Sequence, residues 1–216
     1  MIRHPSPNFG PRRDGLRPGL VVLHYTQMPT AASALRRLCL PEAQVSAHYL
    51  IGRDGTVWHL VDEAMRAWHA GAGLWQGQDD INSRSIGIEL DNDGASPFAW
   101  PQIAALEGVL RGVLARWAIA PAGVIAHSDM APARKVDPGP RFDWRGLARA
   151  GLAVWPRAGG DPAVPLADSL DRIGYPPVEP GLRLAAFRLR FRPQGRGPED
   201  ATDRALASAL AADLGG

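Results

Sequence analysis

Two histidines and one aspartate are the residues whose types and spacing first suggest a chemical site. His24 follows the apolar residues 20–23, and His127 follows residues 124–126, which are also apolar. Asp137 stands ten residues after His127. Two imidazoles and one carboxylate suit a zinc ion whose fourth position stays open. The three residues therefore predict a site for one Zn²⁺ per chain, where a water molecule would ionise near neutral pH.

Each of the three residues also has a purely structural interpretation. A histidine at the end of a strand often only completes a hydrogen bond. Asp137 belongs to an Asp-Pro-Gly sequence, which favours a turn. For Asp137 the two interpretations are compatible, because a turn can present the carboxylate to an ion.

The elements that must position these residues are predicted from hydrophobic spacing, with a period of two for strands and 3.6 for helices. Strands that alternate with helices favour an α/β fold, with a mixed central sheet flanked by helices. His24 and His127 would then stand at strand ends, where a sheet holds side chains rigidly. Strands are expected at residues 20–25, 45–51, 56–61, 85–90 and 124–126, and helices at residues 30–38, 101–117 and 144–150.

The chain changes character after residue 156. Residues 157–161 are rich in glycine and alanine and are predicted to link a first domain, residues 1–156, to a second unit, residues 162–216. Three short helical patterns follow, near residues 164–173, 182–191 and 202–214. A unit this small has little core of its own. It is expected to pack on the first domain or to form a compact three-helix module.

Composition and charge exclude several classes of protein. Hydrophobic residues make up 45% of the chain and charged residues 21%, which indicates a packed globular protein. The net charge is only +2 and the arginines are scattered, so a solvated surface is expected and nucleic acid is not a predicted partner. A single cysteine, Cys39, excludes a disulfide within the chain.

The compartment is predicted from the N-terminal sequence. It lacks the apolar run of a secretory signal, and no stretch approaches the ~20 apolar residues of a membrane span. A cytoplasmic location is expected, or a periplasmic one if a leader has been removed. The oligomeric state is left open.

Five short sequences occur in the order typical of one known family. They are VVLHYT at residues 21–26, SAHYLI at 46–51, NSRSIGIE at 82–89, HSD at 127–129 and KVDPG at 135–139. Together they resemble the zinc N-acetylmuramoyl-L-alanine amidases of the AmpD/AmiD type, which share a fold with T7 lysozyme and the peptidoglycan recognition proteins. The resemblance covers roughly residues 5–150.

The resemblance implies roles for five residues. His24, His127 and Asp137 would be the metal ligands. Glu89, which stands between apolar neighbours on a predicted strand, would be the general base. Lys135 is the only lysine in the chain, and its ammonium group would stabilise the oxyanion. The alternatives are a surface glutamate on an edge strand and a solvated lysine.

One further residue is expected near the metal and two beside the substrate cleft. His48 matches a histidine of the family that lies close to the ion without binding it, and we expect it to orient a ligand or the substrate by a hydrogen bond. Trp68 and His69 stand in a sequence, Trp-His-Ala-Gly, that resembles a segment beside the substrate cleft. For these two residues, packing or surface exposure is an equally good interpretation.

The resemblance implies hydrolysis of the amide bond between N-acetylmuramic acid and L-alanine. The predicted partners are peptidoglycan fragments, in particular muropeptides with a 1,6-anhydro sugar in peptidoglycan recycling. The alternatives are a cell-wall amidase of broader specificity in the envelope and a non-catalytic peptidoglycan-binding protein. Residues 162–216 resemble, more weakly, the peptidoglycan-binding-like helical module that follows the catalytic domain in AmiD-type enzymes.

Overall fold

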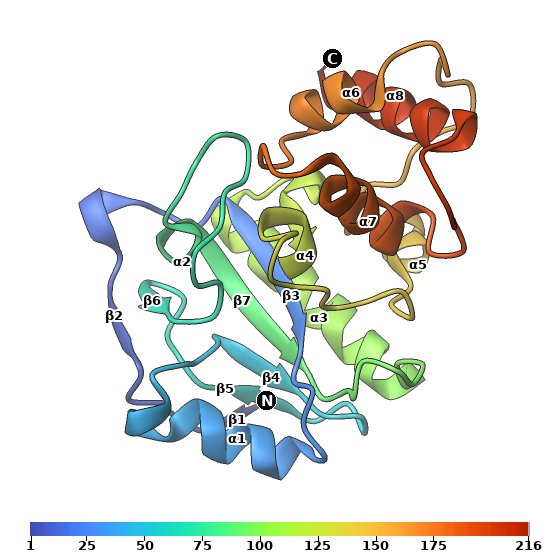
Figure 1. Ribbon diagram of the computed structural model, residues 1–216. Helices are drawn as coiled ribbons and strands as arrows, with labels where there is room; N and C mark the ends of the chain where they lie inside the picture. Colours follow the sequence, from blue (N-terminus) through green and yellow to red (C-terminus); the bar gives the residue numbers. More distant parts are fainter. Residues whose placement is uncertain (216) are drawn as a thin grey trace.

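A mixed six-stranded sheet forms the centre of the protein (Figure 1). The computed structural model describes residues 1–215. The strand order is β1 (Ile2–Arg3), β5 (Val57–His59), β4 (Tyr49–Ile51), β7 (Ser85–Leu90), β3 (Leu20–Tyr25) and β8 (Val124–Ala126). Strands β4, β7, β3 and β8 run parallel to one another, and β5 lies antiparallel to β4. A separate two-stranded sheet pairs β2 (Phe9–Pro11) with β6 (Met65–Ala67).

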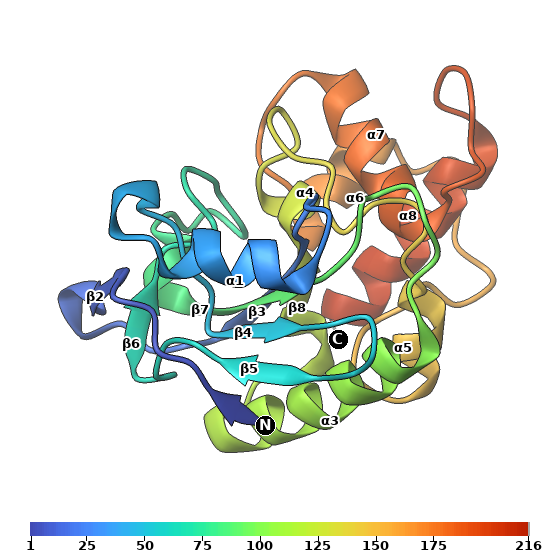
Figure 2. The same ribbon diagram turned by 90° about the horizontal axis from the view of Figure 1, so that it is seen from below.

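One face of the central sheet is buried under two helices, α3 (Trp100–Trp117) and α5 (Trp144–Arg149). Figure 2 shows the strands lying between α3 on one side and α1 on the other. The apolar stripe of α3 is Leu106, Val109, Leu110 and Val113, at helical spacing, so one side of the helix fits the sheet. This layer is the larger part of the core.

The opposite face of the sheet is covered in two places, with a gap between them. Helix α1 (Ala31–Cys39) packs Ala34 and Leu38 near Leu50 of β4. At the other end, Val22 and Ile125 pack against the C-terminal helices. Between these two covers lie the carboxyl ends of β3 and β7, which carry the residues of the site.

The C-terminal helices α6 (Leu166–Ile173), α7 (Pro180–Phe191) and α8 (Ala201–Gly215) gather at one end of the molecule (Figure 1). They do not enclose a core of their own. Phe187 and Leu210 belong to the same hydrophobic cluster as Val22, Ile125 and Trp75 of the first part of the chain. The helices therefore pack on the first domain, which is one of the two arrangements expected.

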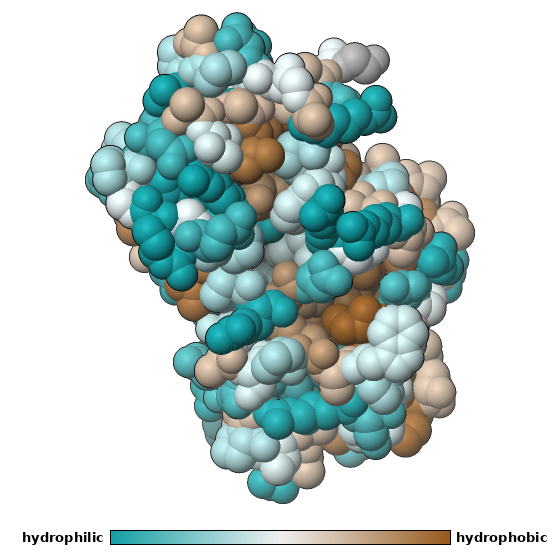
Figure 3. Space-filling model, turned by 90° about the vertical axis from the view of Figure 1, so that its right-hand side faces the viewer, coloured by the Kyte–Doolittle hydropathy of each residue, from teal (hydrophilic) through white to brown (hydrophobic). Residues whose placement is uncertain are grey.

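Two very short helices connect strands to loops near the site. These are α2 (Ile81–Arg84), directly before β7, and α4 (His127–Met130), directly after β8. Single turns of 3₁₀ helix occur at Arg13–Gly15, Pro41–Ala43 and Pro121–Gly123. On the face shown in Figure 3, hydrophobic side chains reach the surface in small patches separated by hydrophilic ones. Among residues 1–215, no helix has the length and apolar character that crossing a membrane requires.

The predicted fold class is confirmed, and three predicted strands have their observed bounds, at β3, β7 and β8. The strand expected over residues 45–51 is wrong in its first half, because loops engage that backbone. The Ser46 amide donates to the Trp68 carbonyl at 3.0 Å, and the Ser46 hydroxyl donates to the Asn8 carbonyl at 2.6 Å. The expected hairpin strand over residues 56–61 shortens to β5.

The expectation that the arginines form a solvated surface is wrong for three of them. Arg183, Arg188 and Arg190 of α7 are at most 8% exposed. Each guanidinium meets a carboxylate, on Asp171, Asp203 or Asp129 respectively. Sequence spacing does not reveal such pairing, because the acidic partners lie 12 to 61 residues away.

Candidate active site

The site is built at the carboxyl ends of three parallel strands. β3 and β7 are paired in register with His24 opposite Glu89, so these two side chains lie next to each other on the same face of the sheet. β8 ends at Ala126, and His127 is the first residue of α4. Parallel strands end at the same edge of a sheet, which brings together residues far apart in the sequence.

His24, His127 and Asp137 converge on one point, as the sequence predicts. The two Nδ1 atoms are 2.8 Å apart, and each lies 3.0 Å from Oδ2 of Asp137. All three residues are at most 7% exposed. Tetrahedral zinc with bonds of about 2.0–2.1 Å separates its donors by about 3.3 Å, close to these distances. The donor atoms thus fit a single small cation.

The outer nitrogens of both imidazoles are engaged elsewhere, which turns each Nδ1 toward the shared point. Nε2 of His127 donates to the Ala70 carbonyl at 2.9 Å. Nε2 of His24 lies 3.0 Å from Nδ1 of His69. Contacts of this kind fix the orientation of a histidine ligand and its tautomer.

Electrostatics favour the coordinating form of His24 and of Asp137. Burial, followed by the neighbouring His127, lowers the pKa of His24 to about 4, so its imidazole is neutral at pH 7. Burial opposes ionisation of Asp137, but its close contacts with His127 and His24 outweigh this effect and lower the pKa of the carboxyl. Neutral imidazole and ionised carboxylate are the coordinating states.

A cleft of about 320 Å³ opens over this point, between α1 and the loop that carries Asp137. Glu89, Lys135, Trp68 and His69 all line it, together with the three donors. Oε2 of Glu89 is buried and has no hydrogen-bond partner within the described chain. Burial, and secondly the charge of Asp137, raise the pKa of Glu89 to about 8, which Lys135 partly opposes.

His48 lies near the site, but its hydrogen-bonding partners are backbone groups and Arg12, whose Nη2 lies 3.3 Å from Nε2 of His48. Its Nδ1 accepts from the Gly87 amide at 2.9 Å, and its Nε2 lies 3.2 Å from the Met65 carbonyl. It contacts none of the three donors, whereas His69 does. We expected His48 to orient a metal ligand by a hydrogen bond, but it is His69 that contacts His24. His48 instead links β7 to β6.

The placement of His69 depends on a glycine. Gly87 lies on β7, and a Cβ atom there would come within 2.3 Å of the His69 ring. On its far side, Nε2 of His69 lies 3.2 Å from the hydroxyl of Ser85, which donates to the Ile81 carbonyl at 2.6 Å. The His69 amide donates to Oδ1 of Asn82 at 3.0 Å. Asn82 was not predicted as a site residue, although it stands in one of the five sequences that carry the resemblance.

Comparison with known proteins agrees with this geometry. Residues 14–140 match the N-acetylmuramoyl-L-alanine amidase family. The chain is 37% identical to the N-acetylmuramoyl-L-alanine amidase AmiD of Escherichia coli, over 88% of this chain and 81% of AmiD. It is 35% identical to the 1,6-anhydro-N-acetylmuramyl-L-alanine amidase AmpD of Enterobacter cloacae, over 66% of this chain and 86% of AmpD.

Solved structures give the same result over nearly the whole chain. AmiD from E. coli, in complex with anhydro-N-acetylmuramic acid-L-Ala-D-gamma-Glu-L-Lys, superposes with a TM-score of 0.84 at 36% identity, over 94% of this chain and 92% of that one. AmpDh3 from Pseudomonas aeruginosa superposes with a TM-score of 0.86 at 30% identity, over 94% of this chain and 95% of that one. The chain therefore belongs to the family of N-acetylmuramoyl-L-alanine amidases and is an amidase.

Proposed function

We propose that this protein is a zinc-dependent amidase that cleaves the bond between N-acetylmuramic acid and L-alanine in muropeptides. The observation that carries the proposal is the convergence of His24, His127 and Asp137 in a cleft also lined by Glu89 and Lys135. The three donors would hold Zn²⁺. When bound, zinc supplies Lewis acidity, which polarises a carbonyl group and acidifies water.

Glu89 is proposed as the general base. Its register position beside His24 places the carboxylate in the same cleft as the three donors, and its unpaired Oε2 is free to accept a proton. A carboxyl with a raised pKa holds a proton more readily than an ordinary one, so the same group can pass it to the departing alanine nitrogen. A cation held by His24, His127 and Asp137 would lower this pKa and so favour the basic form of Glu89.

Lys135 is proposed to stabilise the negative charge that develops on the carbonyl oxygen. It lines the same cleft as Glu89, on the loop that also carries Asp137. A fixed ammonium group beside the reacting carbonyl stabilises the transition state more than the ground state. Trp68 offers an apolar surface at the mouth of the cleft, and a sugar or the stem peptide would pack on it.

The 1,6-anhydro form of the sugar is the proposed natural substrate, and peptidoglycan recycling is the proposed role. The name of AmpD and the substrate in the AmiD complex both carry the anhydro sugar, which supports this choice. Recycled fragments are met in the cytoplasm, so this role agrees with the location predicted from the sequence. An envelope amidase of broader specificity would also accept muropeptides with a reducing-end sugar.

The test combines one variant with one substrate comparison. Glu89→Ala should bind zinc as the wild type does and lose ~10²–10⁴ in rate, because it removes only the general base. Chelation should abolish activity and added zinc should restore it. Products are identified by mass spectrometry on matched anhydro and reducing-end muropeptides. Full activity of Glu89→Ala would refute the role of Glu89, and equal rates on both sugars would favour the envelope alternative.

A further inference from the structure

The short helix that carries His127 contains a buried carboxylate that takes no part in the reaction proposed above. Asp129, two residues after His127, is 0% exposed. Its Oδ2 accepts from the Ala126 amide at 2.9 Å, directly before the histidine. A carboxylate removed from water requires charged or hydrogen-bonding partners.

The remaining partners of Asp129 come from the C-terminal helices. Nη1 of Arg190 on α7 lies 2.6 Å from Oδ2, and the hydroxyl of Tyr175, which follows α6, donates to Oδ1 at 2.7 Å. Among residues 1–215, Arg190 is the single basic side chain within ion-pair distance of Asp129. Burial, and then the charge of Asp129, raise the pKa of the Tyr175 hydroxyl well above its usual value, so it stays a donor.

Arg190 contacts the chain on both sides of His127. While Nη1 binds Asp129, Nη2 donates to the Val124 carbonyl at 3.0 Å, at the start of β8. The guanidinium also lies 4.1 Å from the ring centroid of Trp144. One rigid, planar group thus fixes residues 124 and 129 relative to each other, and His127 is held between them.

We propose that the C-terminal helices position the metal ligand His127, and that Arg190 is the positioning residue through its simultaneous contacts with Val124 and Asp129. The proposal rests on the proposed function, in which His127 binds zinc. Removal of Arg190 leaves the Asp129 carboxylate buried without its ion-pair partner. The turn would then shift to reach water, and His127 would move with it.

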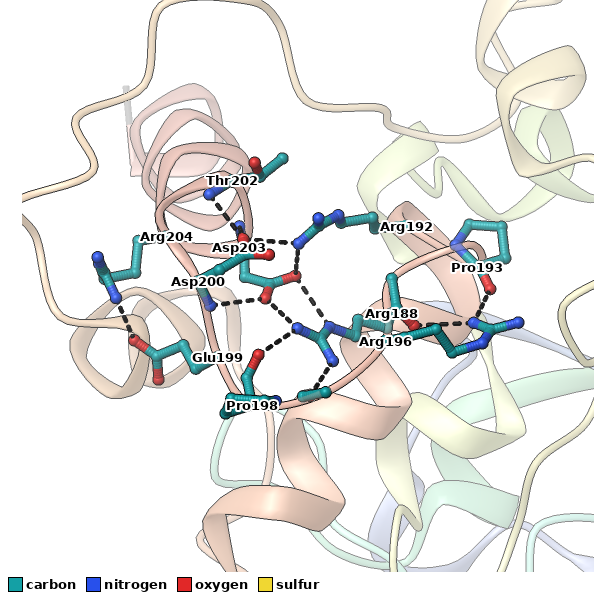
Figure 4. A network of polar contacts seen from close by, with 12 residues as sticks. Arg188, Arg192, Pro193, Arg196, Pro198, Glu199, Asp200, Thr202, Asp203 and Arg204 are labelled. Atoms are coloured by element: carbon teal, nitrogen blue, oxygen red, sulfur yellow. Dashed lines mark hydrogen bonds and ion pairs between the residues drawn. The ribbon is translucent and has the colours of Figure 1, made fainter.

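The same helix supplies a matched control. Arg188 forms an equally close buried ion pair, at 2.5 Å, with Asp203 of α8. Its other partners are the carbonyls of Gly197 and Pro198. Figure 4 shows this network, in which Arg188 and Arg192 both reach Asp203 and every labelled residue belongs to the C-terminal helices and their loops. Replacement of Arg188 therefore removes a similar ion pair with no contact to residues 124–129.

The test measures zinc affinity of the full chain by competition with a chromophoric chelator, under conditions where near-ultraviolet circular dichroism shows each variant folded. Arg190→Gln should weaken zinc binding ~10–100-fold, as for other residues that orient a metal ligand. Arg188→Gln should stay within about twofold of the wild type, because its partners lie away from the ligand turn. Unchanged affinity in Arg190→Gln, or an equal loss in Arg188→Gln, overturns the proposal.

If Arg190→Gln does not fold, a milder variant tests whether the C-terminal helices position His127. Tyr175→Phe removes one hydroxyl and leaves the packing in place, and it should weaken zinc binding by a smaller factor. Wild-type affinity in a folded Tyr175→Phe would then contradict the proposal. Absence of zinc binding by the wild-type chain would instead refute the proposed function, so the two failures are distinguishable.

Discussion

At the scale of single residues, the site contains four neighbouring histidines, and each imidazole ring has different hydrogen-bonding partners. His24 and His127 turn Nδ1 to the shared point, and His69 supports His24 from behind. His48 is nearby, with its ring centroid 5.8 Å from that of His69, yet its partners are backbone groups and Arg12. His48 and His69 should therefore have different effects when they are replaced.

Replacement of His69 should weaken the proposed binding of zinc. His69→Phe keeps the ring volume over Gly87 but removes the nitrogen that faces Nε2 of His24. We expect zinc affinity to fall ~10–100-fold, as measured by chelator competition, because the ligand loses its orienting contact.

His48→Phe is the matched control for this variant. It should lower the free energy of unfolding by ~1–3 kcal/mol, since the buried Gly87 amide loses its acceptor. Its zinc affinity should stay close to that of the wild type. Equal zinc affinities in both variants would contradict the assignment of His69.

At the scale of elements, the hydrogen bonds of one carboxylate, that of Glu63, link helix α3 to strand β4. Glu63, in the loop between β5 and β6, accepts from the Tyr49 hydroxyl at 2.5 Å. It also accepts hydrogen bonds from two side chains of α3, from Nε of Arg116 at 3.0 Å and from Nε1 of Trp117 at 2.6 Å. Burial opposes ionisation of Glu63, but the hydrogen bonds from Arg116, Tyr49 and Trp117 outweigh it and lower the pKa to about 2.

This shift predicts how stability depends on pH. The folded-state pKa of Glu63 is below the unfolded value of about 4.3, so its contribution is complete above that value and is lost as pH falls toward 2. Between pH 6 and pH 3.5 the loss from this residue should be about 1 kcal/mol. Urea unfolding of metal-free protein should show a flatter pH profile for Glu63→Gln. If the stability of the wild type and of Glu63→Gln fell equally with falling pH, Glu63 would not be the cause of the pH dependence.

At the scale of the whole molecule, the C-terminal helices share a hydrophobic cluster with the sheet. Phe187 of α7 is fully buried in this cluster with Val22 and Ile125. The hypothesis that residues 162–216 bind peptidoglycan stays a prediction. The shared cluster means that these helices and the sheet should unfold together.

Calorimetry can check this coupling. The full chain should show one cooperative transition, and Phe187→Ala should lower its midpoint as a whole, with a loss of ~3–5 kcal/mol for the buried ring. A chain that ends at residue 156 should lose the cooperative transition, because the cluster around Val22 and Ile125 would face water. Two transitions, of which Phe187→Ala shifts one, would mean that the helices fold independently.

The sequence by itself determined the parts of this protein that depend on local pattern. The apolar runs before His24 and His127 predict strands whose bounds are those observed for β3 and β8. The prediction succeeds because a strand buried on both faces needs continuous apolar residues. The strand that carries Glu89 and the long helix α3 follow from the hydrophobic period in the same way. Five short motifs in order were sufficient to identify the family.

Tertiary structure alone decided which groups meet across long distances in the chain. The resemblance placed His48 near the metal and His69 beside the substrate cleft, but only the packing of His69 over Gly87 decides which of them contacts His24. Arg190 appeared to be one more surface arginine, until folding brought it to Asp129, 61 residues away. Such pairs leave no periodic signal, because their partners are selected by the docking of whole elements.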